Sequence, residues 1–512
     1  MTVWRSVRRG WPLLLTLLLA LPTLSYPMGW DQSVYSYIGW GMLHGYPPYR
    51  DAWAQNAPGN FFVYAAAFKL LGETADAISL LGLAESLAGT AAVMVAARLL
   101  LGARYAALAG ALYGLTAALG MDYRDRQEPE ALMAVAVTLV VAVLVAAYRA
   151  SRWVLPAWAL AGALAAACTL LKPTGGVAFV LALAVPMILK GSLGGPGLPP
   201  LGAFGAGALV PVVATVTYLS QTGSLPYFYD QVVAYNLHYA GSHYSIAGVH
   251  SWVMLGVQTL LLMGPVPLLA VVGVWVAARR SRNDRSVRLV LVWGGITYLA
   301  VAVQGRHFEY HPYFALPAFS LLAAAAVAHL WEVVRSNRGA LYATAAATAF
   351  FAVVEAVPFG PRLANYGAGI PVALGLADRP GYLDRFRGFS NDPQLRRPVA
   401  DYLQQVSAPQ DRIFAVGEPS IYFEAKRRAP TRLFQELPLW NAGDPKNLLD
   451  QISRDLASEP PRYMTLLMHH EPELFFVREQ EAMLGVVAPL LAERYVLDRT
   501  IERVEIYRLK DG

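Results

Sequence analysis

The sequence has a single cysteine and few charged residues. Of its 512 residues, only 15% are Asp, Glu, Lys or Arg, while 56% are hydrophobic. This scarcity of charge argues against a soluble globular protein, in which about a quarter of the residues are charged. Cys168 stands alone inside an apolar run. The sequence therefore excludes an intrachain disulfide and a zinc site built from cysteines.

A glycine-rich loop that binds phosphate between a strand and a helix is also missing, so neither a nucleotide-driven motor nor a nucleotide-sugar site of the soluble type is supported. The net charge of +6 would suit a partner such as nucleic acid, but the basic residues stand in short clusters between apolar runs. Such clusters are typical of the ends of membrane spans. The sequence predicts a protein that contacts membrane lipids and binds neither nucleic acid nor nucleotide.

Long apolar runs recur along the first 355 residues. Each is near the roughly 20 residues that a helix needs to cross the hydrocarbon of a bilayer. The segment Gly59 to Leu71 is apolar but has only 13 residues, so we expect an interfacial helix there. About eleven spans remain, at about 11–27, 76–98, 105–121, 131–148, 153–171, 174–190, 201–219, 252–278, 288–304, 312–334 and 339–357.

The basic clusters predict the orientation of these spans in the cytoplasmic membrane of the cell. With Arg5, Arg8 and Arg9 in the cytoplasm, the later clusters also fall in the cytoplasm, provided that Gly59 to Leu71 does not cross. The N-terminus is then cytoplasmic. The predicted outer segments are 28–75, 122–130, a turn at Lys172, 220–251, 305–311 and everything after about 358.

The composition changes after residue 358, where Arg, Asp, Glu and Pro become frequent. We predict an α-helical transmembrane domain, 1–358, and a small extracytoplasmic α/β domain, 359–512. Short strands are expected at 412–416 and 463–468, with two more within 494–509. Helices are expected at 393–405, 446–456 and 479–491.

Asp31 follows the first span by a few residues and is the first candidate for chemistry. A carboxylate at this depth is costly unless it is hydrated or paired. The alternative, with equal weight, is an N-cap for a helix over 32–44, because Asp is a favoured capping residue.

The loop 122–130 holds four carboxylates, among them Asp125, Glu128 and Glu130, and two guanidiniums. A solvated turn is the default interpretation of such a charge run. The loop is short, however, and the predicted topology places it on the same face as Asp31. Its carboxylates are therefore candidates for a general base or for ligands of a divalent metal ion.

Lys172 ends a long apolar run. Snorkelling of its ammonium to the interface is the simplest explanation, and contact with a lipid phosphate is the alternative. The segment Arg306 to His311 offers similar cations in another outer loop. Glu85 stands near the centre of the second span, where we expect a structural role.

Several short motifs resemble the glycosyltransferase C superfamily. They are Asp31 with Tyr35 four residues later, Gly45-Tyr46-Pro47-Pro48-Tyr49-Arg50-Asp51, Asn56-Ala57-Pro58, Glu128-Pro129-Glu130, Leu171-Lys172-Pro173, Arg306 to Tyr313, and Asp411-Arg412-Ile413-Phe414 followed by Tyr422-Phe423. The nearer likeness is to the bacterial protein O-mannosyltransferase-like, aminoarabinose transferase-like and rhizobial galacturonosyltransferase-like enzymes. One departure is Asn56, where many members carry Lys or His before a Pro-Pro pair.

This resemblance implies an outer-face site and a polyprenyl-phosphate-linked sugar as donor. It places Asp31 at the catalytic acidic position and Glu130, with Glu128 beside it, at the second acidic position. It places Lys172 and Arg306 near the lipid phosphate. The remaining candidates around the substrate are Tyr35, Tyr49, Asn56, His307, Tyr310 and His311.

The sequence thus predicts a membrane glycosyltransferase with Asp31 as general base. The acceptor, whether lipid, glycan or protein, is left open. The alternative is a transporter or flippase for lipid-linked saccharides, in which ionisable groups would line one route across the membrane.

Overall fold

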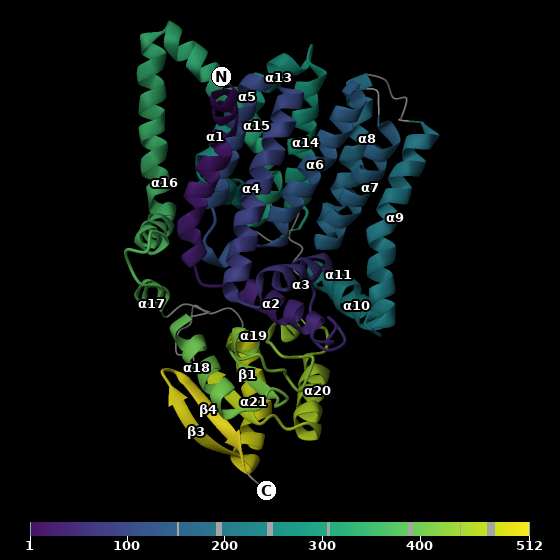
Figure 1. Ribbon diagram of the computed structural model, residues 1–512, viewed down its shortest axis with the longest axis vertical. Helices are drawn as coiled ribbons and strands as arrows, with labels where there is room; N and C mark the ends of the chain where they lie inside the picture. Colours follow the sequence, from purple (N-terminus) through teal and green to yellow (C-terminus); the bar gives the residue numbers. More distant parts are fainter. Residues whose placement is uncertain are drawn as a thin grey trace. The chain divides into compact units, whose positions relative to one another are not determined.

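The computed structural model describes residues 2–150, 153–190, 197–242, 249–304, 308–387, 393–440, 442–467 and 477–510 (Figure 1). Its spatial contacts divide the chain into two compact units. The first consists of Met1–Tyr26, Ser79–Thr215 and Tyr244–Leu376, and the second of Pro27–Ile78, Val216–His243 and Ala377–Gly512. The division predicted at residues 358 and 359 stays a prediction.

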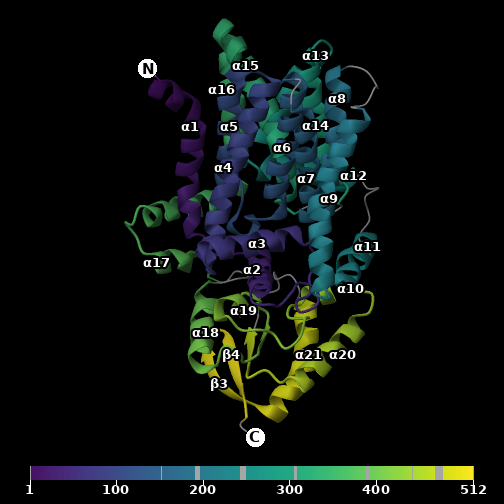
Figure 2. The same ribbon diagram turned by 45° about the vertical axis from the view of Figure 1, so that its right-hand side comes forward.

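The first unit is a bundle of long helices. Its elements are α1 (Thr2–Ala20), η1 (Leu21–Ser25), α4 (Ala75–Leu100), α5 (Ala103–Leu119), η2 (Tyr123–Asp125), α6 (Pro129–Ala150), α7 (Val154–Leu171), η3 (Pro173–Gly176), α8 (Val177–Lys190), α9 (Leu198–Gln221), α12 (Val249–Leu262), α13 (Pro265–Ser281), α14 (Arg285–Ala302), η5 (His311–Ala315), α15 (Leu316–Ser336) and α16 (Arg338–Ala373). Neighbours in the bundle include α13 with α15, α6 with α7, α1 with α5, and α8 with α14 (Figures 1 and 2).

Seven helices of the described part of the chain are long and apolar enough to cross a membrane. They are Ala75–Leu100, Pro129–Ala150, Val154–Leu171, Pro173–Lys190, Leu198–Gln221, Arg285–Ala302 and His311–Ser336. Each corresponds to a predicted span, which confirms a polytopic membrane protein. The count of eleven and the orientation stay predictions.

Two predicted spans differ from the helices that form. The span 252–278 is two helices, because α12 ends at Leu262 and α13 begins at Pro265. Gly264, between them, has φ +72°, and Pro265 lacks the N–H that would continue a helix from the preceding turn. The span expected to end at residue 357 continues within α16 to Ala373.

Glycine lets α7 and α9 approach closely. A Cβ added at Gly207 would lie 1.8 Å from the backbone oxygen of Ala159, and one at Gly162 would lie 2.0 Å from that of Phe204. Small residues at such contacts are a common way to pack membrane helices. The lone Cys168 is buried in the same region, with its Sγ 3.8 Å from the Met133 oxygen on α6.

The second unit combines short helices with a small sheet. Its helical elements are α2 (Trp30–Leu43), α3 (Gly59–Leu71), α10 (Leu225–Phe228), a π-helical turn η4 (Tyr229–Ala234), α11 (Tyr235–Ser242), α17 (Arg379–Leu383), η6 (Asp384–Phe386), α18 (Pro393–Val406), α19 (Ser420–Ala425), η7 (Leu437–Leu439), α20 (Pro445–Ser458) and α21 (Val477–Arg494). The helix expected at Gly59 to Leu71 is confirmed as α3, while its interfacial placement stays a prediction.

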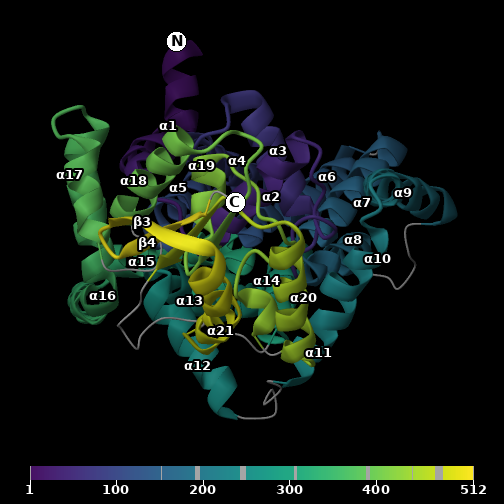
Figure 3. The ribbon, with the colours of Figure 1, turned by 90° about the horizontal axis from the view of Figure 1, so that it is seen from below.

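The sheet contains β1 (Ile413–Val416), β2 (Tyr463–Leu467), β3 (Tyr495–Ile501) and β4 (Val504–Leu509) in the order β1-β2-β4-β3. β1 and β2 are parallel, whereas β4 pairs antiparallel with both β2 and β3. Phe414 pairs with Met464 and Val416 with Leu466, so all four point to one face. This face packs on α20 and α21 through Ile452, Leu456, Met483 and Val487. The two helices lie side by side (Figure 3). The predicted strands and helices of the tail are thereby confirmed.

Candidate functional site

Glu130 lies in the first turn of α6, directly after Pro129. Proline suits this position because its fixed φ matches the helix and its missing N–H would have no helical partner. The Glu130 side chain is only 1% exposed, and Glu128 is buried as well. The helix N-terminus favours a negative charge at Glu130.

Lys172 brings a cation to this carboxylate from the end of α7. Its backbone is extended, with φ −158° and ψ 140°, as the following Pro173 requires. The Lys172 Nζ donates to Glu130 Oε1 at 2.5 Å and lies 3.0 Å from His311 Nε2. Because an ammonium can only donate, Nε2 is the acceptor in this contact, and the same nitrogen lies 3.7 Å from Glu130 Oε1.

Aromatic rings complete the surroundings of Lys172. The ammonium lies 5.8 Å from the ring centroid of Tyr310, which favours a cation near its face. The Tyr310 ring meets that of His311 edge-on, with centroids 4.8 Å apart. We call Glu130, Lys172, Tyr310 and His311 the Lys172 cluster. It joins three outer segments that were predicted separately.

A second charged group follows α5 in the same unit. Arg362, on α16, pairs with Glu309, donates to the Gly120 oxygen at 3.1 Å, and has its Nε 3.9 Å from Asp122 Oδ2. Sequence reasoning missed Arg362 because the last span was expected to end before it. The only signal was an arginine inside an otherwise apolar helical segment.

Asp125 belongs to this second group. Burial, with the carboxylates of Glu309 and Asp122 nearby, raises its pKa to about 8, although Arg124 and Arg362 oppose the shift. Its carboxyl therefore holds a proton at neutral pH. The structure does not bring Asp125 into a group of three or more possible metal ligands among the described residues.

Glu85 lies on α4 in this unit, and its side chain is buried. It lines a cavity of about 20 Å³ together with Arg126, Tyr113 and Tyr313. Its Oε1 has no hydrogen-bond partner within the described ranges. Its expected structural role stays a prediction.

Asp31 lies in the first turn of α2, in the second unit, and is half-buried. The N-cap of α2 is Gly29, whose N–H donates to the side chain of Gln32. The alternative in which Asp31 caps this helix is therefore wrong. Its charge is nevertheless favoured by the helix N-terminus.

Three other candidates form a hydrogen-bonded chain in the second unit. Asn56 Nδ2 donates to Tyr35 Oη at 3.1 Å, and Tyr49 Oη donates to the Asn56 oxygen at 2.9 Å. Gln231 fixes the loop by donating to the Tyr49 oxygen and accepting from Ala54 N, both at 2.9 Å. Tyr49 has φ +68°, a conformation that these bonds hold in place.

Arg396, on α18, is a buried residue that the sequence did not single out. Its Nη1 donates to the Met28 oxygen at 3.0 Å, and its Nε lies 3.1 Å from Glu424 Oε1. It thus ties the tail to the segment that leads into α2. An arginine in a strongly amphipathic tail helix carries no sequence signal for this contact.

Arg306 and His307 lie outside the described residues. Among those described, no group of three or more His, Cys, Asp or Glu side chains could hold a metal ion. Glu130 is already neutralised by Lys172. These donors do not fit the predicted divalent metal, and we derive no step through one.

Residues 55–216 match the sequence family described as dolichyl-phosphate-mannose-protein mannosyltransferase. No curated protein matches the sequence. Together with the fold, this family match confirms the resemblance to the glycosyltransferase C superfamily.

The fold is similar to solved structures over nearly its whole length. ArnT from Cupriavidus metallidurans, bound to undecaprenyl phosphate, matches with a TM-score of 0.59 and 17% identity, covering 97% of this chain and 98% of that one. ArnT in its apo state matches with a TM-score of 0.55 and 16% identity, covering 97% of each chain. The Archaeoglobus fulgidus oligosaccharyltransferase tethered to an acceptor peptide matches with a TM-score of 0.51 and 11% identity, covering 96% of this chain and 73% of that one.

Proposed function

We propose that this protein is a membrane glycosyltransferase that transfers a sugar from a polyprenyl phosphate to an acceptor on the outer face of the cytoplasmic membrane. The observation that carries the proposal is the fold, which matches over 97% of the chain that of an ArnT bound to undecaprenyl phosphate. The family match over residues 55–216 supports the same donor class.

In the proposed reaction, the Asp31 carboxylate accepts the proton of an acceptor hydroxyl. The hydroxyl oxygen attacks the anomeric carbon of the sugar, and the bond from that carbon to the phosphate oxygen breaks. The electron pair leaves with the polyprenyl phosphate. Because the hydroxyl oxygen attacks from the face opposite the phosphate in a single displacement, the configuration at the anomeric carbon inverts. Asp31 lies in the first turn of α2, where the helix N-terminus lowers the cost of a negative charge, and this position suits a carboxylate that acts as a base.

The Lys172 cluster is proposed to stabilise the departing phosphate. The Lys172 side chain is 26% exposed, so it can reach a ligand while the buried Glu130 holds its ammonium in place. Glu130 is thus assigned a positioning role, acting through Lys172. A fixed cation next to a phosphate whose charge grows stabilises the transition state without further rearrangement.

The test is to incubate the purified protein with a polyprenyl-phosphate sugar and measure release of the lipid phosphate. Asp31→Asn should lose transfer while it still binds the donor, because its volume and helix position are kept. Asp384→Asn is the matched control, since Asp384 is an exposed carboxylate that pairs with Arg387. Full activity of Asp31→Asn would remove Asp31 from the mechanism. If the protein, reconstituted in lipid vesicles, moves the intact donor from one leaflet of the vesicle membrane to the other without releasing lipid phosphate, the flippase alternative is favoured.

A further inference from the structure

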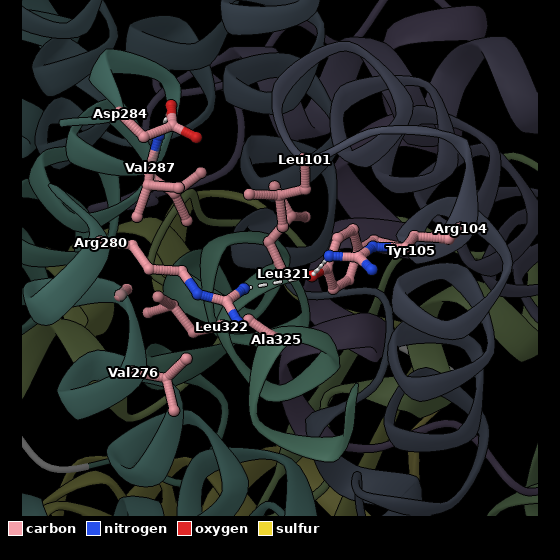
Figure 4. A pocket seen from close by; sticks show the side chains of 12 residues that line it. Leu101, Arg104, Tyr105, Val276, Arg280, Asp284, Val287, Leu321, Leu322 and Ala325 are labelled. Atoms are coloured by element: carbon pink, nitrogen blue, oxygen red, sulfur yellow. Dashed lines mark hydrogen bonds between the residues drawn. The ribbon is translucent and has the colours of Figure 1, made fainter. Parts of the chain in front are cut away.

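A cavity of about 110 Å³ lies within the first unit, near the ends of its helices (Figure 4). It is lined by the residue after α4, the start of α5, the end of α13, the first half of α15 and the start of α14. It opens to the surface, because the side chains of Arg104, Arg280 and Asp284 are exposed. Its polar lining consists of Arg104, Tyr105, Arg280 and Asp284. The other walls are aliphatic, from Leu101, Val276, Ala277, Val287, Val290, Leu321, Leu322 and Ala325.

Two guanidiniums converge on one phenol oxygen in this cavity. Arg104 Nη2 donates to Tyr105 Oη at 2.7 Å, and Arg280 Nη1 donates to the same atom at 3.3 Å. Figure 4 shows both side chains directed to this hydroxyl from opposite sides. Tyr105 is only 5% exposed, so its ring fixes where the two cations meet.

Neither Arg104 nor Arg280 is within ion-pair distance of a carboxylate in the parts of the chain that the structure describes. The carboxylate in the lining, Asp284, caps α14 instead, with its Oδ1 accepting from Ser286 N at 2.9 Å and Val287 N at 3.2 Å. Two like charges that meet at a neutral oxygen gain most from an anion placed between them.

We propose that this cavity binds a phosphate group. Guanidiniums form paired, charge-assisted hydrogen bonds with phosphate oxygens, which suits two arginines that flank one point. The cavity has room for a headgroup but not for a lipid chain. Its aliphatic walls and its position beside basic helix ends are what a lipid phosphate would meet at a cytoplasmic interface.

The proposed phosphate site is separate from the Lys172 cluster. α5 begins at Ala103 beside the cavity and ends at Leu119, just before the loop 122–130. Its 17 residues span roughly 25 Å at 1.5 Å per residue. Under the predicted topology, the two sites lie at opposite membrane faces, so this site does not depend on the proposed transfer reaction.

The experiment titrates the purified protein in detergent with dioleoyl phosphatidic acid and counts bound lipid by native mass spectrometry. Dioleoyl phosphatidylcholine is the zwitterionic comparison, and inorganic phosphate alone forms a second arm. Arg104→Gln with Arg280→Gln should weaken retention of phosphatidic acid by at least about tenfold, because two charge-assisted contacts are lost. The matched control is Arg98→Gln with Arg282→Gln, which removes two exposed arginines of the same predicted face that do not line the cavity.

Tyr105→Phe keeps the ring and the fold while it removes the shared acceptor, and it should weaken retention less than the double variant. Displacement of the lipid by millimolar inorganic phosphate would identify a free phosphate as the ligand. Retention against phosphate would identify a lipid headgroup. Equal weakening by the two arginine pairs, or no preference for phosphatidic acid over phosphatidylcholine in the wild-type protein, would overturn the proposal.

Discussion

Removing either member of the ion pair between Lys172 and Glu130 should lower the free energy of unfolding by different amounts, because the two side chains differ in exposure. Glu130 is 1% exposed and Lys172 is 26% exposed. Lys172→Met leaves a buried carboxylate without its cation, which costs about 3–5 kcal/mol of the free energy of unfolding. Glu130→Gln leaves an ammonium that can reach water, so we expect a smaller cost of about 1–2 kcal/mol.

A variant that removes both charges tests whether the stability effects of the two substitutions are coupled or independent. Lys172→Met with Glu130→Gln removes both charges, so it should be more stable than Lys172→Met alone. The assay is the apparent unfolding temperature in detergent, measured by tryptophan fluorescence at one fixed scan rate because such unfolding is often irreversible. The control pair is Arg387→Gln and Asp384→Asn, which are 56% and 49% exposed and should change little. If the double variant is the least stable and the two costs simply add, the two side chains are not coupled and the reasoning fails.

Two further predictions concern Asp125 and the α7–α9 contact. The pKa of Asp125 is raised to about 8, above its unfolded value, so this carboxyl stabilises the fold at low pH and its contribution falls as pH rises from about 4 to about 8. The difference in unfolding temperature between wild type and Asp125→Asn, measured from pH 5 to pH 9, should shift in favour of the variant as pH rises, and a flat difference would contradict the shift. Gly207→Val should destabilise the fold by about 1–3 kcal/mol because its Cβ meets backbone. Gly205→Val, with open space around it, is the control, and equal stability of the two variants would contradict the close approach.

The elements that were predictable are those set by local patterns. The length of the apolar run Gly59 to Leu71 predicted a separate short helix. Short apolar runs in the tail predicted β1 and β2, and the two remaining strands were predicted only as a range, 494–509. The residues that end or cap helices were harder to predict from the sequence. The break at Gly264 was missed because the apolar composition of 252–278 continues across it. Asp31 was offered as one possible cap of α2 because Gly29 has no side-chain signal.

The site was predictable as a set of residues but not as a set of contacts. Lys172, Glu130 and His311 were each named, yet their hydrogen bonds join residues 42 and 139 positions apart. Such contacts depend on how α6, α7 and η5 pack, and no local pattern encodes that packing. The same reason hid Arg362 and Arg396, whose partners lie on elements distant in sequence.

Because Cys168 is buried, the wild-type chain can serve directly as the background for experiments that label introduced cysteines. Its thiol is the only one in the sequence, and it is enclosed between α6 and α7. A membrane-impermeant maleimide should therefore leave the wild-type protein unlabelled in intact cells, so that any new cysteine reports on its own position alone. Single cysteine replacements at exposed residues such as Asp384 and Arg282 would then assign a side of the membrane to the tail and to the turn between α13 and α14, without removing a native cysteine first.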